Sequence, residues 1–140
     1  MLIYKLRERV EALNLNLKGR VVLTEAATRA YVVTPILAAL AGAKVYAFSK
    51  NSRYGSVEDV FRQTEELYKG VEERLDINYI DNLTPDIIAQ ADMITNSGHL
   101  RSLNKEKLQY AKDTAVIPLM YEAWEWRDAD LDINYIKSRG

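Results

Sequence analysis

The apolar residues of this chain follow two spacings, one helical and one typical of buried strands. Near the N-terminus they recur every three to four residues, which predicts an amphipathic helix with its apolar stripe at Leu2, Leu6, Val10 and Leu13. Short apolar and β-branched runs predict five strands, at residues 20–24, 44–49, 77–80, 92–95 and 114–119. Pro118 cannot donate to a strand ladder, so the last strand is expected at a sheet edge or ends at Ile117.

Residues that commonly cap helices lie between these strands. Thr34 and Thr84 each precede a proline, a pair that predicts a helix start. Ser56 and Asp59 have the spacing of a capping box and predict the start of the longest helix. A further helix is expected over residues 102–111.

The alternation of strands and helices predicts the fold class. Strands separated by helices of about ten residues pair in parallel through right-handed crossovers. We therefore expect an α/β three-layer sandwich with a mostly parallel five-stranded sheet, flavodoxin-like or Rossmann-like. The length of 140 residues matches one α/β domain over residues 1–140.

The hexamer LDINYI occurs twice, at residues 75–80 and 131–136. We expect the first copy to enter a strand. The second copy follows Asp128 and Asp130, which are candidate caps, and is expected to form a helix. One hexamer can take both conformations because tertiary context overrides local propensity.

Composition excludes several classes of protein. The chain has no cysteine and a single histidine, His99, which excludes disulfides, iron–sulfur clusters, thiolate zinc sites and His-rich metal sites. A net charge of −1 argues against a nucleic-acid binder. No window approaches the roughly 20 apolar residues of a membrane span, and the N-terminus lacks the apolar core of a signal peptide. We therefore expect a cytoplasmic protein that binds neither nucleic acid nor membranes and holds no metal.

Ligands of parallel α/β sheets bind outside the carboxyl ends of the strands, so the loops after the strands are the candidate sites. The loop after the first strand has no glycine, and the side chains of residues 26–31 would crowd a pyrophosphate. The chain thus has no glycine-rich dinucleotide loop, and whether NAD(P) or another cofactor binds it stays open.

The loop after the second strand has the donors expected of a phosphate or nucleotide site. It leads into a helix N-terminus, which favours an anion, and the candidate binding residues are Lys50, Ser52, Arg53 and Ser56. The alternative interpretation is a solvated polar turn that ends in a serine cap.

The loop after the fourth strand holds the strongest cluster of functional side chains. His99 is the candidate catalytic residue, because its side chain titrates near neutral pH. The candidate substrate-binding residues are Asn96, Ser97, Gly98, Arg101 and, from the loop after the fifth strand, Glu122. An exposed histidine without a function is the alternative.

Large aromatic residues follow the fifth strand. Tyr121, Trp124 and Trp126 could wall a pocket, but aromatic side chains also concentrate at subunit and domain interfaces. We expect an interface here, either in a homo-oligomer or with a further domain.

Residues 91–140 resemble a stretch of the D-2-hydroxyacid dehydrogenase family. The similar pattern is a strand of the type A-D-M-I-T, a polar turn, a helix (LNKEKLQYAK), an apolar strand (TAVIPL) and an aspartate-led helix (DLDINYIKSRG). The resemblance implies a flavodoxin-like substrate domain, as the N-terminal portion of a longer two-domain protein whose second domain would bind NAD. The polar turn after the first of these strands, Asn96-Ser97-Gly98-His99, departs from the family pattern.

Three functions follow, in this order. The first is the substrate or accessory domain of a dehydrogenase-like protein, which contributes the His99 loop to a cleft shared with another domain or subunit and is inactive alone. The second is a small-molecule binding module for a nucleotide or phosphorylated metabolite, using the Lys50–Ser56 loop with Glu25 and His99. The third is a structural dimerisation domain.

Overall fold

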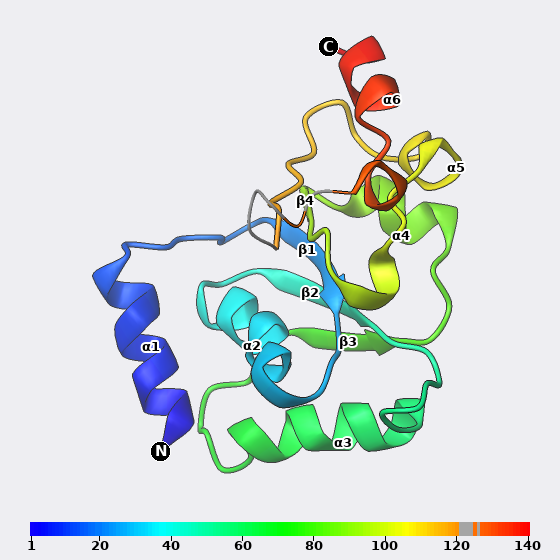
Figure 1. The fold of residues 1–140 in the computed structure, drawn as a ribbon. Helices are drawn as coiled ribbons and strands as arrows, with labels where there is room; N and C mark the ends of the chain where they lie inside the picture. The colour runs from blue at the N-terminus through cyan, green and yellow to red at the C-terminus, as the bar shows by residue number, and fades with distance from the viewer. Residues whose placement is uncertain (121–124, 126) are drawn as a thin grey trace.

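The computed structural model describes residues 1–120, 125 and 127–140. Strands and helices alternate in it as predicted (Figure 1). The strands are β1 (Val21–Glu25), β2 (Lys44–Phe48), β3 (Ile77–Ile80) and β4 (Met93–Ile94). The α-helices are α1 (Leu2–Ala12), α2 (Val33–Leu40), α3 (Val57–Tyr68), α4 (Pro85–Gln90), α5 (Lys105–Leu108) and α6 (Ile133–Ser138). Short 3₁₀ helices are η1 (Arg29–Val32), η2 (Gly98–Leu100) and η4 (Asp128–Asp130).

The four strands form one parallel sheet in the order β3-β2-β1-β4. In its register Val22 of β1 pairs with Val45 of β2 on one side and with Met93 of β4 on the other. The chain builds outward from β1 to β3 and then crosses back to place β4 on the far side of β1. This reversal makes the carboxyl ends of β1 and β4 the switch point, where ligands of open α/β sheets bind.

The prediction of five strands is wrong by one. Residues 114–119 run parallel to β4 through two isolated bridges, Met93 with Val116 and Asn96 with Leu119, and form no continuous strand among the described residues. Pro118 explains the interruption, because it accepts a hydrogen bond from the Asn96 N–H but has no N–H to return. The segment does lie beside β4 at the edge of the sheet, as the proline predicts.

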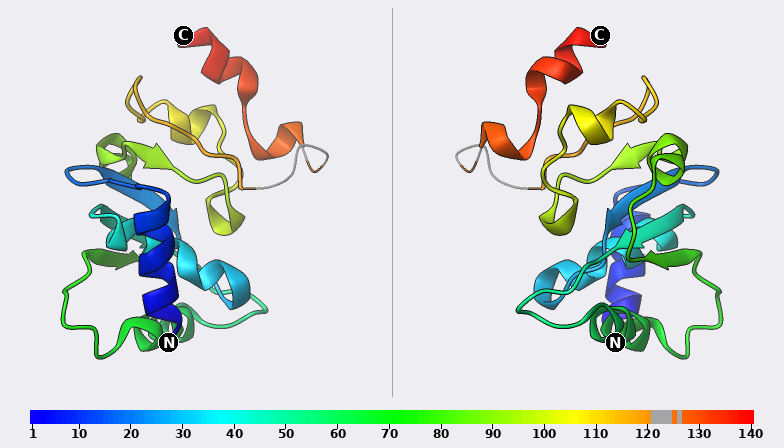
Figure 2. Two further views of the ribbon diagram at one scale, coloured as in Figure 1. Left: turned by 90° about the vertical axis from the view of Figure 1, so that its left-hand side faces the viewer. Right: turned by 90° about the vertical axis from the view of Figure 1, so that its right-hand side faces the viewer.

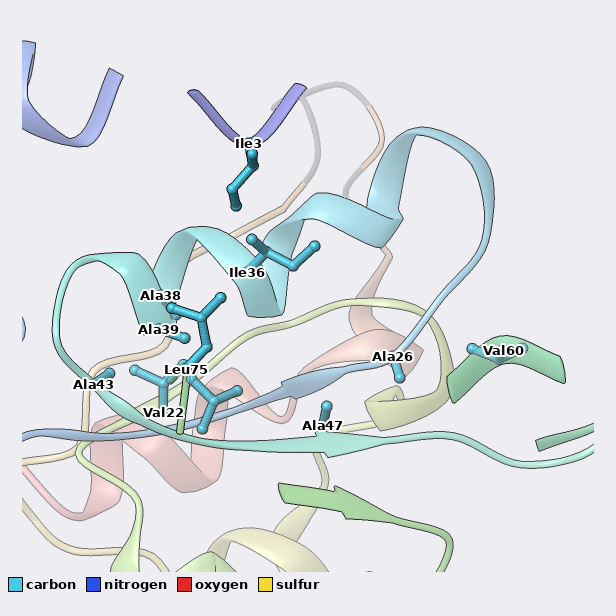
Figure 3. Packing of buried hydrophobic residues seen from close by; sticks show 11 residues of the cluster. Ile3, Val22, Ala26, Ile36, Ala38, Ala39, Ala43, Ala47, Val60 and Leu75 are labelled. Atoms are coloured by element: carbon cyan, nitrogen blue, oxygen red, sulfur yellow. The ribbon is translucent and has the colours of Figure 1, made fainter. Parts of the chain in front are cut away.

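Two apolar clusters cover the two faces of the sheet, because neighbouring residues of a strand point to opposite sides. On β1, Val22 joins the cluster under α1, α2 and α3, whereas Leu23 joins the cluster with α4 and α5. Figure 3 shows Ile36 of α2 and Ile3 of α1 stacked above the sheet in the first cluster. The two views of Figure 2 place the N-terminus and α6 at opposite ends of the molecule.

The predicted cap of α3 is confirmed in a modified form. The Ser56 hydroxyl accepts a hydrogen bond from the Asp59 N–H, 3.2 Å away, and lies 3.0 Å from the Asp59 carboxylate. The Thr84 hydroxyl likewise accepts from the Ile87 N–H at the start of α4. Thr34 caps nothing, because η1 runs directly into α2 and places this residue inside the helix.

The two copies of LDINYI do adopt two conformations. Ile77–Ile80 forms β3, whereas Ile133–Ser138 forms α6. The cap of α6 is Asp132, whose carboxylate accepts a hydrogen bond from the Tyr135 N–H, and neither Asp128 nor Asp130 has this role. None of the described helices is long and apolar enough to cross a membrane.

Candidate functional site

A pocket of about 450 Å³ opens at the carboxyl ends of the strands. Three loops line it: the loop after β1, the loop after β2 and the loop after β4. The lining side chains that bear charge or polar groups include Glu25, Thr28, Arg29, Ser52, Tyr54, Ser97, His99 and Arg101. The pocket therefore lies at the switch point between β1 and β4.

The loop after β1 brings one buried anion and one exposed cation. Glu25 is the last residue of β1 and only 6% exposed. Arg29 begins η1 with a φ of 59°, a left-handed conformation that is costly for any residue with a side chain. The turn places the exposed Arg29 at the pocket, beside the loop after β2.

Tyr54 joins the first two loops. Its ring lies between two guanidinium groups, with the Arg29 carbon 5.7 Å and the Arg53 carbon 4.8 Å from the ring centroid. Arg53 also donates a hydrogen bond to the Tyr54 hydroxyl, 2.6 Å away. Cation–π contacts of this kind hold arginines near an aromatic face at modest energy. The pocket rim on this side thus carries two neighbouring positive charges.

The loop after β4 is tied to the sheet by buried hydroxyl groups. Thr24 of β1 and Thr95 are joined through their hydroxyls at 2.8 Å, and Thr95 is joined in turn to the Ser97 hydroxyl at 2.8 Å. All three residues are buried, so this hydrogen-bonded chain fixes Ser97 at the pocket wall.

The same loop is held from outside by two cations. Arg101 donates to the Asn96 carbonyl through Nε and Nη2, at 3.3 and 3.2 Å. The Lys107 ammonium donates to the carbonyls of Leu100 and Ser102, at 3.0 and 2.9 Å. Burial, and to a smaller extent the positive charge of Lys50, lowers the pKa of Lys107. Both cations therefore position the loop, and of the two only Arg101 also lines the pocket.

Glu25 connects the first and third loops directly. The His99 N–H donates to one carboxylate oxygen of Glu25 at 2.9 Å. Gly98 makes this approach possible, because a Cβ at this position would clash with the Glu25 carboxylate. Gly98 also has a φ of 39°, in the left-handed region that favours glycine.

The structure brings together only part of the residues predicted from sequence. His99, Ser97, Gly98 and Arg101 line the pocket with Ser52, and Arg53 contacts the lining residue Tyr54. The buried Asn96 is not among the lining residues, and neither are Lys50 and Ser56, the latter serving as the helix cap. Glu122 and the predicted interface residues Tyr121, Trp124 and Trp126 lie outside the described residues.

The loop after β1 contributes side chains that sequence reasoning underrated. Arg29, Thr28 and Tyr54 line the pocket but were not among the candidates. The signal for Arg29 was its place in the loop after the first strand, which was examined only for the glycines of a dinucleotide site. Among the described residues, no group of three or more carboxylate or imidazole side chains could hold a metal ion.

Comparison with known proteins bears on the fold. No protein-family model matches the sequence, and no curated protein matches it either. The structure is similar to shikimate dehydrogenase from Aquifex aeolicus, with a TM-score of 0.57 and 13% identity over 95% of this chain and 44% of that one. It also matches the Escherichia coli oxidoreductase yciK over 72% of this chain and 48% of that one, with 18% identity and a TM-score of 0.38, too low to support an inference.

The chain thus spans less than half the length of the shikimate dehydrogenase that it matches. The resemblance of residues 91–140 to the D-2-hydroxyacid dehydrogenase family in particular stays a prediction. At 13% identity the similarity to shikimate dehydrogenase concerns the fold alone. Together with the strand order, it shows that this chain has a Rossmann-like parallel α/β fold, as found in dehydrogenases.

Proposed function

We propose that this chain is the small-molecule-binding domain of a dehydrogenase-like protein, and that the pocket at the carboxyl ends of β1, β2 and β4 holds a phosphorylated ligand. The observation that carries the proposal is the convergence of three loops on one pocket with Arg29 at its rim. The domain would contribute this pocket to a larger protein and would transfer no hydride on its own.

The charge of the lining favours an anion. Two arginines, Arg29 and Arg101, face a single carboxylate, Glu25, and a third arginine, Arg53, lies next to the pocket on Tyr54. Arginine is the residue best suited to phosphate and carboxylate because its planar group donates several hydrogen bonds at once.

The hydroxyl groups of the lining favour phosphate over carboxylate. Thr28, Ser52 and Ser97 come from three different loops and line the pocket from different sides. A phosphate monoester presents three terminal oxygens in a tetrahedral arrangement and can accept from donors in several directions. A carboxylate accepts mainly within its own plane, so it would use fewer of these groups.

The strained conformation of Arg29 offers a sharp test. Thermal unfolding of the full chain would be followed with and without AMP, glucose 6-phosphate and NADP. At ten times its Kd, a bound ligand adds about 1.4 kcal/mol of stability, which raises the Tm by roughly 4 °C. In Arg29→Gly the ligand-induced shift is expected to vanish, whereas the Tm without ligand is kept or raised because glycine accepts the left-handed φ.

Asn14→Gly is the matched control. Asn14 also has a left-handed φ, of 50°, but follows α1 and does not line the pocket. This variant should keep the full ligand-induced shift. A shift that persists in Arg29→Gly, or no shift with any of the three ligands in the unaltered chain, would refute the proposal.

A further inference from the structure

Glu25 is a buried carboxylate with one oxygen available for a ligand. The residue is 6% exposed and lines the pocket, and its Oε2 accepts the His99 N–H at 2.9 Å. Within the described part of the chain, no other hydrogen bond or ion pair reaches its side chain. Gly98 keeps the carboxylate in place from one side, since any side chain there would collide with it.

A buried carboxylate is costly unless its oxygens accept hydrogen bonds, because it has lost most of its water. The protein satisfies one oxygen and leaves the other to whatever fills the pocket. A carboxylate only accepts hydrogen bonds when it is ionised, so the group that complements it must be a donor. The candidate donors on a small molecule are hydroxyl and ammonium groups.

We infer that the ligand of this pocket carries, besides its phosphate, a hydroxyl or ammonium group that donates to Glu25. The inference rests on the proposed function and adds the second half of the ligand. It gives the pocket two ends: Arg29 and Tyr54 hold the anion, and Glu25 beside His99 accepts the donor.

The same arrangement disfavours a polyphosphate. Glu25 closes the carboxyl end of β1, where the glycine-rich loop of a dinucleotide-binding domain would cradle the pyrophosphate. A second phosphate placed there would meet a carboxylate of like charge in a partly water-excluded site, where such repulsion is strong. The ligand is thus expected to be a phosphate monoester with a polar, donor-bearing body.

Isothermal titration of the full chain with matched probes tests the inference. The probes are n-propyl phosphate, which has no donor, glycerol 3-phosphate, which has hydroxyl groups, 3-aminopropyl phosphate, which has an ammonium group, and inorganic pyrophosphate. At least one donor-bearing ester is expected to bind about tenfold or more tightly than n-propyl phosphate, and pyrophosphate no more tightly than n-propyl phosphate. The preference between glycerol 3-phosphate and 3-aminopropyl phosphate identifies the donor.

Glu25→Gln is the diagnostic variant. Its amide oxygen can still accept from the His99 N–H, while its NH₂ group replaces the available oxygen with a donor. The preference for the donor-bearing ester should fall to within about threefold, with binding of n-propyl phosphate kept or improved.

The outcomes separate the inference from the proposed function. If the three esters bind the unaltered chain equally, or if pyrophosphate binds most tightly, the inference is overturned while phosphate binding stands. If the preference survives in Glu25→Gln, the donor lies elsewhere and the inference is again wrong. If none of the four probes binds, the proposed function itself fails, and the inference fails with it.

Discussion

Gly98 is the residue on which the geometry of the pocket depends most. It combines a φ of 39° with a backbone position against the Glu25 carboxylate. We expect Gly98→Ala to lower the free energy of unfolding by about 2–4 kcal/mol, because it adds left-handed strain to a steric clash. Chemical denaturation measures this loss, and titration with glycerol 3-phosphate should show that binding is lost as well.

Gly70→Ala separates strain from the clash. Gly70 has a φ of 85° but nothing within 4 Å of the added Cβ. This variant should lose only about 1 kcal/mol and keep its affinity for the ligand. Equal losses of stability in the two variants would show that the contact between Gly98 and Glu25 is unimportant.

Sequence predicted the residue types of the site better than their roles. Gly98 and His99 were both selected, but from sequence their loop had no partner. The hydrogen bond from the His99 N–H to Glu25 joins residues 74 positions apart, a pairing that no local pattern encodes. Arg29 was missed for a related reason, because its contact with Tyr54 depends on where β2 places the following loop.

At the scale of elements, Asp92 joins the amino ends of two strands to α5. Its carboxylate accepts the Val21 N–H at 2.8 Å and the Lys112 ammonium at 2.9 Å, and its side chain is 22% exposed. The hydrogen bond from the Val21 N–H, followed by that from Lys112, lowers the pKa of Asp92.

This lowered pKa predicts a pH dependence with a definite sign. Because the folded pKa lies below the unfolded value of about 3.9, Asp92 stabilises the fold above that pH, and the contribution is lost as the pH falls through the folded pKa. Asp92→Asn should therefore lower the free energy of unfolding by about 1–2 kcal/mol at pH 7, with the difference shrinking toward pH 3. Urea denaturation at several pH values checks this.

Asp81→Asn provides the control for that experiment. Asp81 is exposed, and no hydrogen bond or ion pair to its side chain is seen within the described residues. Its difference from the unaltered chain should stay near zero at every pH. A difference for Asp92→Asn that does not change with pH would contradict the role of its charge.

Most elements could be predicted from local chemistry, and the exceptions have physical causes. Ser56 and Thr84 cap their helices as their positions indicated. Thr34 failed because a 3₁₀ helix precedes α2, and the helix expected at residues 102–111 shrinks to Lys105–Leu108 behind the Asn104 cap. The fifth strand failed at Pro118, where the ladder loses a donor.

At the scale of the whole molecule, the strand order decides where chemistry can occur. Alternating helices and strands predicted parallel pairing, but they did not predict that β4 would lie beside β1 and not beyond β3. That order creates the switch point and brings Glu25, Arg29 and His99 to one pocket. The shared rim expected for the loops after the second and fourth strands is found for Ser52 and His99.

The measurement that tests the central claim most directly is an NMR titration of the full chain with glycerol 3-phosphate. The account predicts that backbone amide signals of residues 27–31, 52–54 and 97–101 shift together with one Kd, because the three loops line one pocket. Signals of Val21 and Lys44, at the amino ends of β1 and β2, should stay unchanged. No shifts at saturating ligand, or shifts confined to a single loop or to the amino ends of the strands, would contradict it.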